Sequence, residues 1–122
     1  MKKILIVDDQ LEVRELVAVT LRSDDYEVLQ AKNGIEAVEM AKITMPDLII
    51  MDVMMPVMDG IEATRRIKND PATAACTIVM LTAKSQESDR KAGLDAGAAS
   101  YFAKPFSPLE LLKKVEEVLS GA

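Results

Sequence analysis

The chain has 122 residues, of which 49% are hydrophobic and 29% charged, a size and composition typical of one globular domain. Its formal net charge of -5 excludes the basic surface that nucleic-acid binding requires and disfavours adsorption to anionic lipid. No apolar run approaches the roughly 20 residues of a membrane-spanning helix. The start of the chain turns acidic at Asp8, too early for a signal peptide. We therefore expect a single cytoplasmic domain over residues 1–122, with no nucleic-acid or membrane partner.

Cysteine and histidine usage restricts the available chemistry. Cys76 is the only cysteine, so no internal disulfide can form, and the lack of histidine excludes a Cys/His zinc site. It also removes the usual general base and the Ser–His and Cys–His nucleophile pairs. A reducing cytoplasm fits this usage, and any chemistry must rest on carboxylates, hydroxyls and lysine.

Five short segments predict β-strands. Residues 48–52 form an unbroken apolar run that ends in Asp52, as in a strand buried on both faces. Residues 26–31 mix polar and apolar side chains, which suits the edge of a sheet. The predicted strands cover residues 3–7, 26–31, 48–52, 77–82 and 99–103.

Five predicted helices alternate with these strands, and most begin or end at a recognisable capping residue. The predicted N-caps are Asp9, Asn33, Asp59 and Ser107, and the predicted C-terminal glycines are Gly97 and Gly121. The helices cover residues 10–22, 34 to Pro46, 59–68, 86–96 and 107–119.

This alternation of nearly solid apolar strands with helices predicts a parallel sheet covered on both faces. Right-handed crossovers bring the carboxyl ends of all the strands to one edge. We expect a doubly wound, flavodoxin-like α/β fold with five helices and the strand order 2-1-3-4-5 that such folds share. Ligands of these sheets bind outside the carboxyl ends, where strands 1 and 3 meet.

Polar residues stand at the carboxyl ends of four predicted strands. They are Asp8 with Asp9, Asp52, Thr82 and Lys104. Three carboxylates in one crevice repel one another, and each pair costs roughly 3 kcal/mol at about 5 Å and an effective dielectric constant of about 20. Lys104 alone cannot balance them. A hard divalent cation bound through oxygens, with Mg²⁺ the usual cytosolic choice, would make the cluster tolerable.

Each of these residues also has a purely structural interpretation: a helix cap, a solvated charge or a locally bonded hydroxyl. Together those interpretations require four unrelated coincidences at one edge of one sheet. A carboxylate, a divalent cation, a hydroxyl and an ammonium group form a set that handles phosphoryl groups, with the carboxylate as the nucleophile that forms an acyl phosphate. Without a positioned base such a site would turn over slowly, which suits a switch better than an enzyme.

Four segments, in order and at matching spacing, resemble the receiver domain of two-component response regulators, a family that includes the stand-alone chemotaxis regulators. They are residues 4–9 (ILIVDD), 52–60 (DVMMPVMDG), 81–83 (LTA) and 101–106 (YFAKPF). The resemblance extends over the whole chain.

The resemblance implies that Asp52 accepts a phosphoryl group from a sensor histidine kinase or a histidine phosphotransfer protein. Asp8 and Asp9 would hold Mg²⁺ together with Asp52 and the backbone carbonyl of Met54. The side chain of Met54, two residues after the phosphoacceptor, would flank the phosphoryl group and tune dephosphorylation. The chain would then be no enzyme beyond its autocatalytic phosphorylation and dephosphorylation.

The same resemblance implies that the Thr82 hydroxyl and the Lys104 ammonium each contact a phosphoryl oxygen. Lys84 would flank the phosphoryl group, and the peptide bond before Pro105 would be cis. On phosphorylation Thr82 would swing inward with the loop 83–86, and Tyr101 would turn into the space vacated.

We expect a downstream protein to bind the face formed by the helix 86–96, the strand 99–103 and the helix 107–119. The first of these carries Gly93 and few core residues, among them Ala92 and Leu94, so it should be the loosest helix. A monomer and a phosphorylation-dependent dimer are both compatible with this arrangement.

Three alternatives remain at this point. The chain could be the receiver part of a longer regulator whose DNA-binding or enzymatic domain lies beyond Ala122. It could be a Mg²⁺-dependent aspartyl phosphohydrolase, but such enzymes usually carry a second Asp where this chain has Met54. A nucleotide-binding flavodoxin-like protein would need a Gly- or Ser/Thr-rich loop after the first strand, where residues 8–10 are DDQ.

Overall fold

The computed structural model describes residues 1–83 and 87–120, in which five strands alternate with five helices. The strands are β1 (Lys2–Val7), β2 (Tyr26–Ala31), β3 (Leu48–Asp52), β4 (Thr77–Ala83) and β5 (Ser100–Lys104). The helices are α1 (Leu11–Leu21), α2 (Gly34–Thr44), α3 (Gly60–Asn69), α4 (Glu87–Ala96) and α5 (Pro108–Ser120). Most predicted boundaries are correct to within one residue. The predicted first residue of α4, Gln86, and the closing Gly121 lie outside the described residues.

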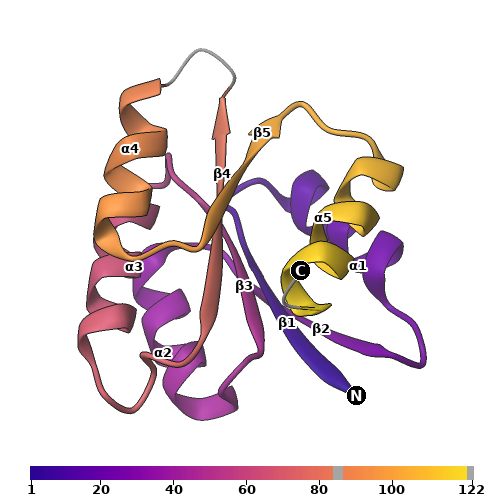
Figure 1. The fold of residues 1–122 in the computed structure, drawn as a ribbon, viewed down its shortest axis with the longest axis horizontal. Coiled ribbons are helices and arrows are strands. Elements are labelled where there is room, and N and C mark those ends of the chain that lie inside the picture. The colour runs from indigo at the N-terminus through magenta and orange to yellow at the C-terminus, as the bar shows by residue number, and fades with distance from the viewer. Residues whose placement is uncertain (84–86, 121–122) are drawn as a thin grey trace.

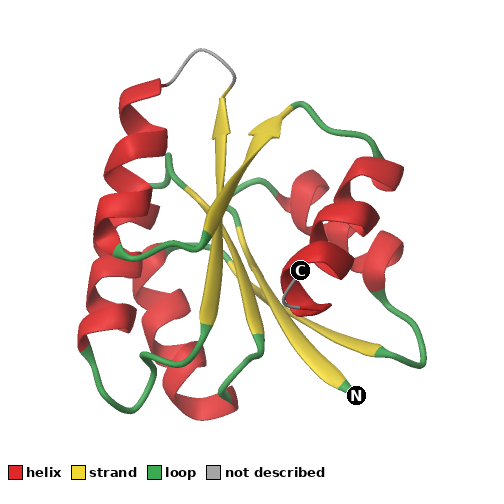
Figure 2. Cartoon of the chain, in the orientation of Figure 1, coloured by secondary structure: helices red, strands yellow, loops and turns green. Residues whose placement is uncertain are grey.

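The strands form one parallel sheet in the order β2-β1-β3-β4-β5, which confirms the predicted doubly wound fold. Helices α2, α3 and α4 cover one face, and α1 and α5 cover the other (Figure 1). Figure 2 shows the sheet as a layer between these two groups of helices. All strands run the same way, so their carboxyl ends lie at one edge.

The two faces of the central strands explain why their sequences are apolar throughout. In β1, Leu5 and Val7 belong to the core under α2 and α3, whereas Ile4 and Ile6 belong to the core under α1 and α5. All four side chains are fully buried. Every residue of β3 is buried as well, including Asp52 at its end. Burial of both faces holds the strand ends in place, which matters for the polar groups that follow them.

Side-chain caps begin α2, α3 and α5 as the sequence predicts. Asn33 and Asp59 accept hydrogen bonds from the backbone N–H groups three residues later, and Ser107 exchanges reciprocal bonds with Glu110. Gly97 follows α4 at a φ of 117°, a conformation that favours glycine.

The prediction that Asp9 caps α1 is wrong. The cap position is Gln10, whose side chain makes no capping bond, and the backbone N–H of Gln10 donates to the carboxylate of Asp8. The Asp9 carboxylate therefore does not cap α1.

The sequence also assigned Leu94 to the core of α4, and this assignment is wrong. Leu94 is 40% exposed, whereas Gly93 is buried and faces the side chain of Met80 on β4. Because Gly93 has no side chain, α4 can lie close to the sheet at this position.

Among the described residues, no helix is long and apolar enough to cross a membrane.

The loop between β3 and α3 is tied at both ends. The N–H of Gly60 donates to the carbonyl of Val53 at 2.9 Å, and the N–H of Gly34 at the start of α2 donates to the carbonyl of Met58 at 3.2 Å. Between these ties Val57 adopts a φ of 71°, which is strained for a β-branched residue. The fold thus imposes the path of the loop next to Asp52.

Substitution of Gly60 tests how closely α3 approaches β3. A Cβ atom at this position would collide with the backbone carbonyl of Asp52, a rigid neighbour, whereas a Cβ at Gly93 would meet the flexible Met80 side chain. We expect Gly60→Ala to lower the free energy of unfolding by more than about 2 kcal/mol. Gly93→Ala, the matched comparison, should lower it by less than Gly60→Ala does, because the Met80 side chain can shift where a backbone carbonyl cannot and better helix propensity offsets part of the contact. Urea unfolding measures both, and equal losses would contradict this account.

Candidate functional site

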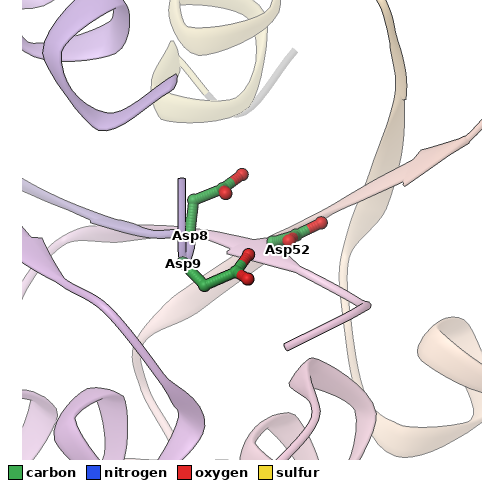
Figure 3. Close-up of side chains that lie close together, drawn as sticks. All are labelled: Asp8, Asp9 and Asp52. Carbon is green, nitrogen blue, oxygen red and sulfur yellow. The ribbon is translucent and has the colours of Figure 1, made fainter. Parts of the chain in front are cut away.

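Three carboxylates meet at the carboxyl edge of the sheet, as the sequence predicts. Asp8 and Asp9 directly follow β1, and Asp52 ends β3. Because β1 and β3 are neighbours, with Val7 opposite Met51, these side chains share one space. One oxygen from each carboxylate lies within 4.8 Å of the other two, and Figure 3 shows the three groups side by side.

Asp8 is the fixed member of this cluster. Its side chain is completely buried, and both oxygens accept hydrogen bonds. The backbone N–H of Gln10 donates to Oδ1 at 2.9 Å, and the ammonium of Lys104 donates to Oδ2 at 2.8 Å. Arg14 adds a bond from Nη1 to the backbone carbonyl of Asp8 at 2.8 Å. These contacts hold the Asp8 carboxylate in one orientation.

Lys104 contacts two of the three carboxylates. Its Nζ lies 2.8 Å from Asp8 Oδ2 and 3.3 Å from Asp52 Oδ1. Lys104 ends β5, and the following bond to Pro105 is cis, as the family resemblance implies. The ammonium therefore reaches from the end of β5 to the ends of β1 and β3.

Burial and charge together perturb the acidities of this cluster. Burial, followed by the charge of Asp8, raises the pKa of Asp52 to about 6, although Lys104 opposes the shift. Burial alone would lower the pKa of Lys104, but the hydrogen bond to Asp8 and the charges of Asp52 and Asp8 outweigh it and raise that pKa. The site therefore resists carrying all of its negative charges at once.

A cavity of about 330 Å³ opens beside these groups. Its polar lining comprises Asp9, Gln10, Asp52, Thr82, Asp89 and Lys104. Thr82 is 3% exposed and stands on β4, between the strands of Asp52 and Lys104. Met54 lies at the rim with its side chain largely exposed. All four strand ends singled out by the sequence thus reach one cavity.

The described lining of this cavity does not include three predicted residues, Asp8, Tyr101 and Pro105. Tyr101 is half-buried on β5 and packs against the core under α2 and α3, away from the cavity lining. Lys84 lies outside the described residues, so its placement stays a prediction.

Sequence reasoning missed Gln10 and Asp89 as cavity residues. Gln10 directly follows the Asp pair, which could have indicated it. Asp89 is one of several charges on α4, and no sequence pattern distinguishes it, because its position depends on how α4 packs.

The donor set fits a hard divalent cation. Three carboxylate oxygens lie close enough to share one ion, and carboxylates are the ligands that Mg²⁺ prefers. Among the described residues Lys104 is the one cation that lines the cavity, so the negative charge is only partly balanced. Burial is the first cause of the raised pKa of Asp52, and the charge of Asp8 adds to it.

The pKa of Asp52 predicts how the metal-free protein responds to pH. The pKa of Asp52 is near 6 in the folded state, above the ordinary value of 3.8, so protonated Asp52 favours the folded state. This stabilisation is fully present below pH 3.8 and is lost as the pH rises through about 6. Asp52→Asn removes this loss. In EDTA at pH 7.5 the variant should be more stable than the wild type by about 2 kcal/mol, and near pH 4 the difference should vanish.

Urea unfolding from pH 4 to 8 measures this difference, with Asp95→Asn on the exposed surface of α4 as the control that should show none. Millimolar Mg²⁺ should narrow the difference because it stabilises the wild type more. A variant less stable than the wild type at pH 7.5 in EDTA would contradict the electrostatic account.

Comparison with known proteins identifies the family. A sequence model described as the response regulator receiver domain matches residues 4–116. The chain is 46% identical over 118 residues to the phosphate regulon transcriptional regulatory protein PhoB of Pseudomonas aeruginosa, a match that covers 97% of this chain and 52% of that protein. It is 39% identical over 122 residues to protein PilH of the same organism, covering 99% of this chain and 100% of PilH.

A solved structure agrees with this match. The receiver domain of the sensor histidine kinase PA1611 from P. aeruginosa PAO1, with magnesium coordinated in its active site cleft, superposes with a TM-score of 0.86 at 36% identity. The superposition covers 99% of this chain and 98% of that chain. The chain spans about half the length of the first curated relatives it matches. Across nearly its whole length, the chain belongs to the response regulator receiver domain family of two-component systems.

Proposed function

We propose that this receiver domain is a phosphoacceptor switch and that Asp52 is the residue that takes the phosphoryl group. The observation that carries the proposal is the position of Asp52. It lines the cavity next to two further carboxylates and lies 3.3 Å from the ammonium of Lys104. Asp8 is fully engaged by two donors, so Asp52 is the better nucleophile.

The donor is a phosphohistidine on a sensor histidine kinase or a histidine phosphotransfer protein. A carboxylate oxygen of Asp52 forms a bond to phosphorus as the bond from phosphorus to the histidine nitrogen breaks. The electron pair of that bond stays on the imidazole, which takes up a proton. The product is an acyl phosphate on Asp52 and a neutral histidine on the partner.

Asp8, Asp9 and Asp52 would hold Mg²⁺, with the backbone carbonyl of Met54 as a fourth protein ligand. The ion would supply positive charge to the phosphoryl oxygens during transfer. The magnesium ion in the PA1611 receiver domain and the spacing of the three carboxylates in this chain both support this assignment. Lys104 would pair with one phosphoryl oxygen, since its ammonium already lies beside Asp52.

Receiver domains are signalling switches rather than classical enzymes. In this chain we infer that turnover is limited to autocatalytic phosphorylation and slow hydrolysis of Asp52. The exposed Met54 side chain at the rim supplies neither an acid nor a base, and the chain has no histidine. Met54 and Lys84 would tune the rate of hydrolysis by their bulk and charge beside the phosphoryl group.

Thr82 would carry the signal from the phosphoryl group to the rest of the domain. Its side chain is buried at the end of β4 and lines the same cavity as Asp52. On phosphorylation the hydroxyl would donate to a phosphoryl oxygen, and Tyr101 on the neighbouring strand would turn inward. The face formed by α4, β5 and α5 would then bind a downstream protein or a second copy of the chain.

Two settings are compatible with this role. PhoB, which is about twice as long as the matched region, is a transcriptional regulatory protein, and the chain could form the receiver part of a longer cytoplasmic regulator. PilH is matched over its full length, which supports a stand-alone regulator that signals by protein contact.

Phosphorylation itself is testable by intact mass. With acetyl phosphate and Mg²⁺ the wild type should gain the mass of one phosphoryl group, and Asp52→Asn should gain none. EDTA should abolish the gain in the wild type, because the carboxylates then repel the phosphoryl group. Asp95→Asn should behave as the wild type does. A modified Asp52→Asn sample would overturn the assignment of the phosphoacceptor.

Thr82→Ala tests the relay. The variant should reach at least about half of the wild-type phosphorylation, because Thr82 contacts the group only after transfer. Amide hydrogen exchange in α4 and β5 should change on phosphorylation in the wild type and stay constant in Thr82→Ala. Thr82→Ser, which keeps the hydroxyl, should restore the change. A wild-type exchange response in Thr82→Ala would show that the signal takes another route.

A further inference from the structure

The first turns of α4 carry two adjacent charged residues that contact different parts of the domain. Asp89 lines the cavity that also contains Asp52. The next residue, Arg90, places its guanidinium carbon 3.9 Å from the centre of the Tyr101 ring on β5. These neighbours thus connect the acidic cavity with an aromatic residue that lies outside it.

The contact between Arg90 and Tyr101 ties α4 to β5. A guanidinium group over an aromatic face at this distance forms a cation–π interaction. The Tyr101 ring also packs against the core that contains Met80, its partner in the β4–β5 register. Gly93 on α4 faces the same Met80 side chain. A shift of α4 therefore changes what the Tyr101 ring contacts.

Because Asp89 lines the cavity, any change of charge there acts on its carboxylate. Among the described residues, the other charged groups that line it are the carboxylates of Asp9 and Asp52 and the ammonium of Lys104. Lys104 forms its ion pairs with Asp52 and with Asp8. A phosphoryl group on Asp52 adds negative charge to the space that Asp89 faces, and like charges repel. The force falls on α4, because Asp89 belongs to that helix.

We propose that Asp89 and Arg90 form a second coupling route, in which Asp89 responds to the charge at Asp52 and Arg90 passes the displacement of α4 to Tyr101. Both are positioning residues, since neither bonds to the phosphoryl group. The route runs through the helix and complements the one through Thr82. Its use in signalling rests on the proposed phosphorylation of Asp52, but the coupling itself exists in the unmodified protein.

Tyrosine resonances report the Arg90 contact directly. The chain has two tyrosines, so ring-¹³C labelling yields signals from Tyr101 and from Tyr26, which serves as the internal reference for folding. Arg90→Gln should shift the Tyr101 signal and leave Tyr26 in place, and Arg90→Lys should shift it less. Lys91→Gln, an exposed neighbour on α4, should shift neither. A Tyr101 signal unchanged in Arg90→Gln would overturn the proposal.

The role of Asp89 is tested in EDTA with unmodified protein, where Asp52→Asn changes the charge of the cavity. This substitution should move the Tyr101 signal, and the movement should fall at least twofold when Asp89→Asn is already present. Asp95→Asn, at the other end of α4, should not reduce it. Equal movements in the Asp89→Asn and wild-type backgrounds would overturn the proposal.

An experiment with phosphorylated protein distinguishes a failure of this proposal from a failure of the proposed function. With acetyl phosphate and Mg²⁺, the Tyr101 movement at equal phosphoryl occupancy, measured by intact mass, should again be at least twofold smaller in Asp89→Asn. If no sample gains mass, the proposed function fails, while the unmodified samples still decide the coupling. If the samples gain mass and the Tyr101 movements are equal, the coupling route is wrong and the phosphoacceptor assignment stands.

Discussion

The ion pairs of Lys104 hold the carboxyl edge of the sheet together. Its ammonium lies 2.8 Å from Asp8 and 3.3 Å from Asp52, so one side chain from β5 reaches the ends of β1 and β3. Strand β4 lies between β3 and β5, and Thr82 is its penultimate residue. The chemistry of the cavity depends on this span, because Lys104 is the one cation among the described lining residues that offsets the mutual repulsion of the three carboxylates.

Lys104 neutralises only part of the negative charge in this cluster, because one ammonium group faces three carboxylates. The remaining negative charge adds to burial in raising the pKa of Asp52, and it makes the site receptive to a divalent cation. The same imbalance makes the cavity sensitive to each further charge that enters it. A switch benefits from this property, because a single group transfer can then change the balance of forces on the elements that line the cavity.

Local patterns predicted most of this structure, because each depends on a few neighbouring residues. Solid apolar runs identified the buried strands, and caps such as Asn33 and Ser107 placed helix starts to within a residue. The meeting of Asp8, Asp9 and Asp52 followed from strand order alone. Features set by tertiary packing could not be predicted. Gly93 rather than Leu94 faces the sheet, and Asp89 reaches the cavity, only because of how α4 lies on β4.

The double tie on the loop between β3 and α3 limits how this chain can vary in length. The N–H of Gly60 binds the carbonyl of Val53 across the loop, and the N–H of Gly34 binds the loop to the start of α2 at Met58. Val57 stays in a left-handed conformation between these bonds. An inserted or deleted residue would break one of these ties and move the Asp52 backbone. Evolutionary insertions and deletions are therefore best tolerated at the opposite, amino-terminal edge of the sheet, where exposed turns such as residues 22–25 lie far from the chemistry.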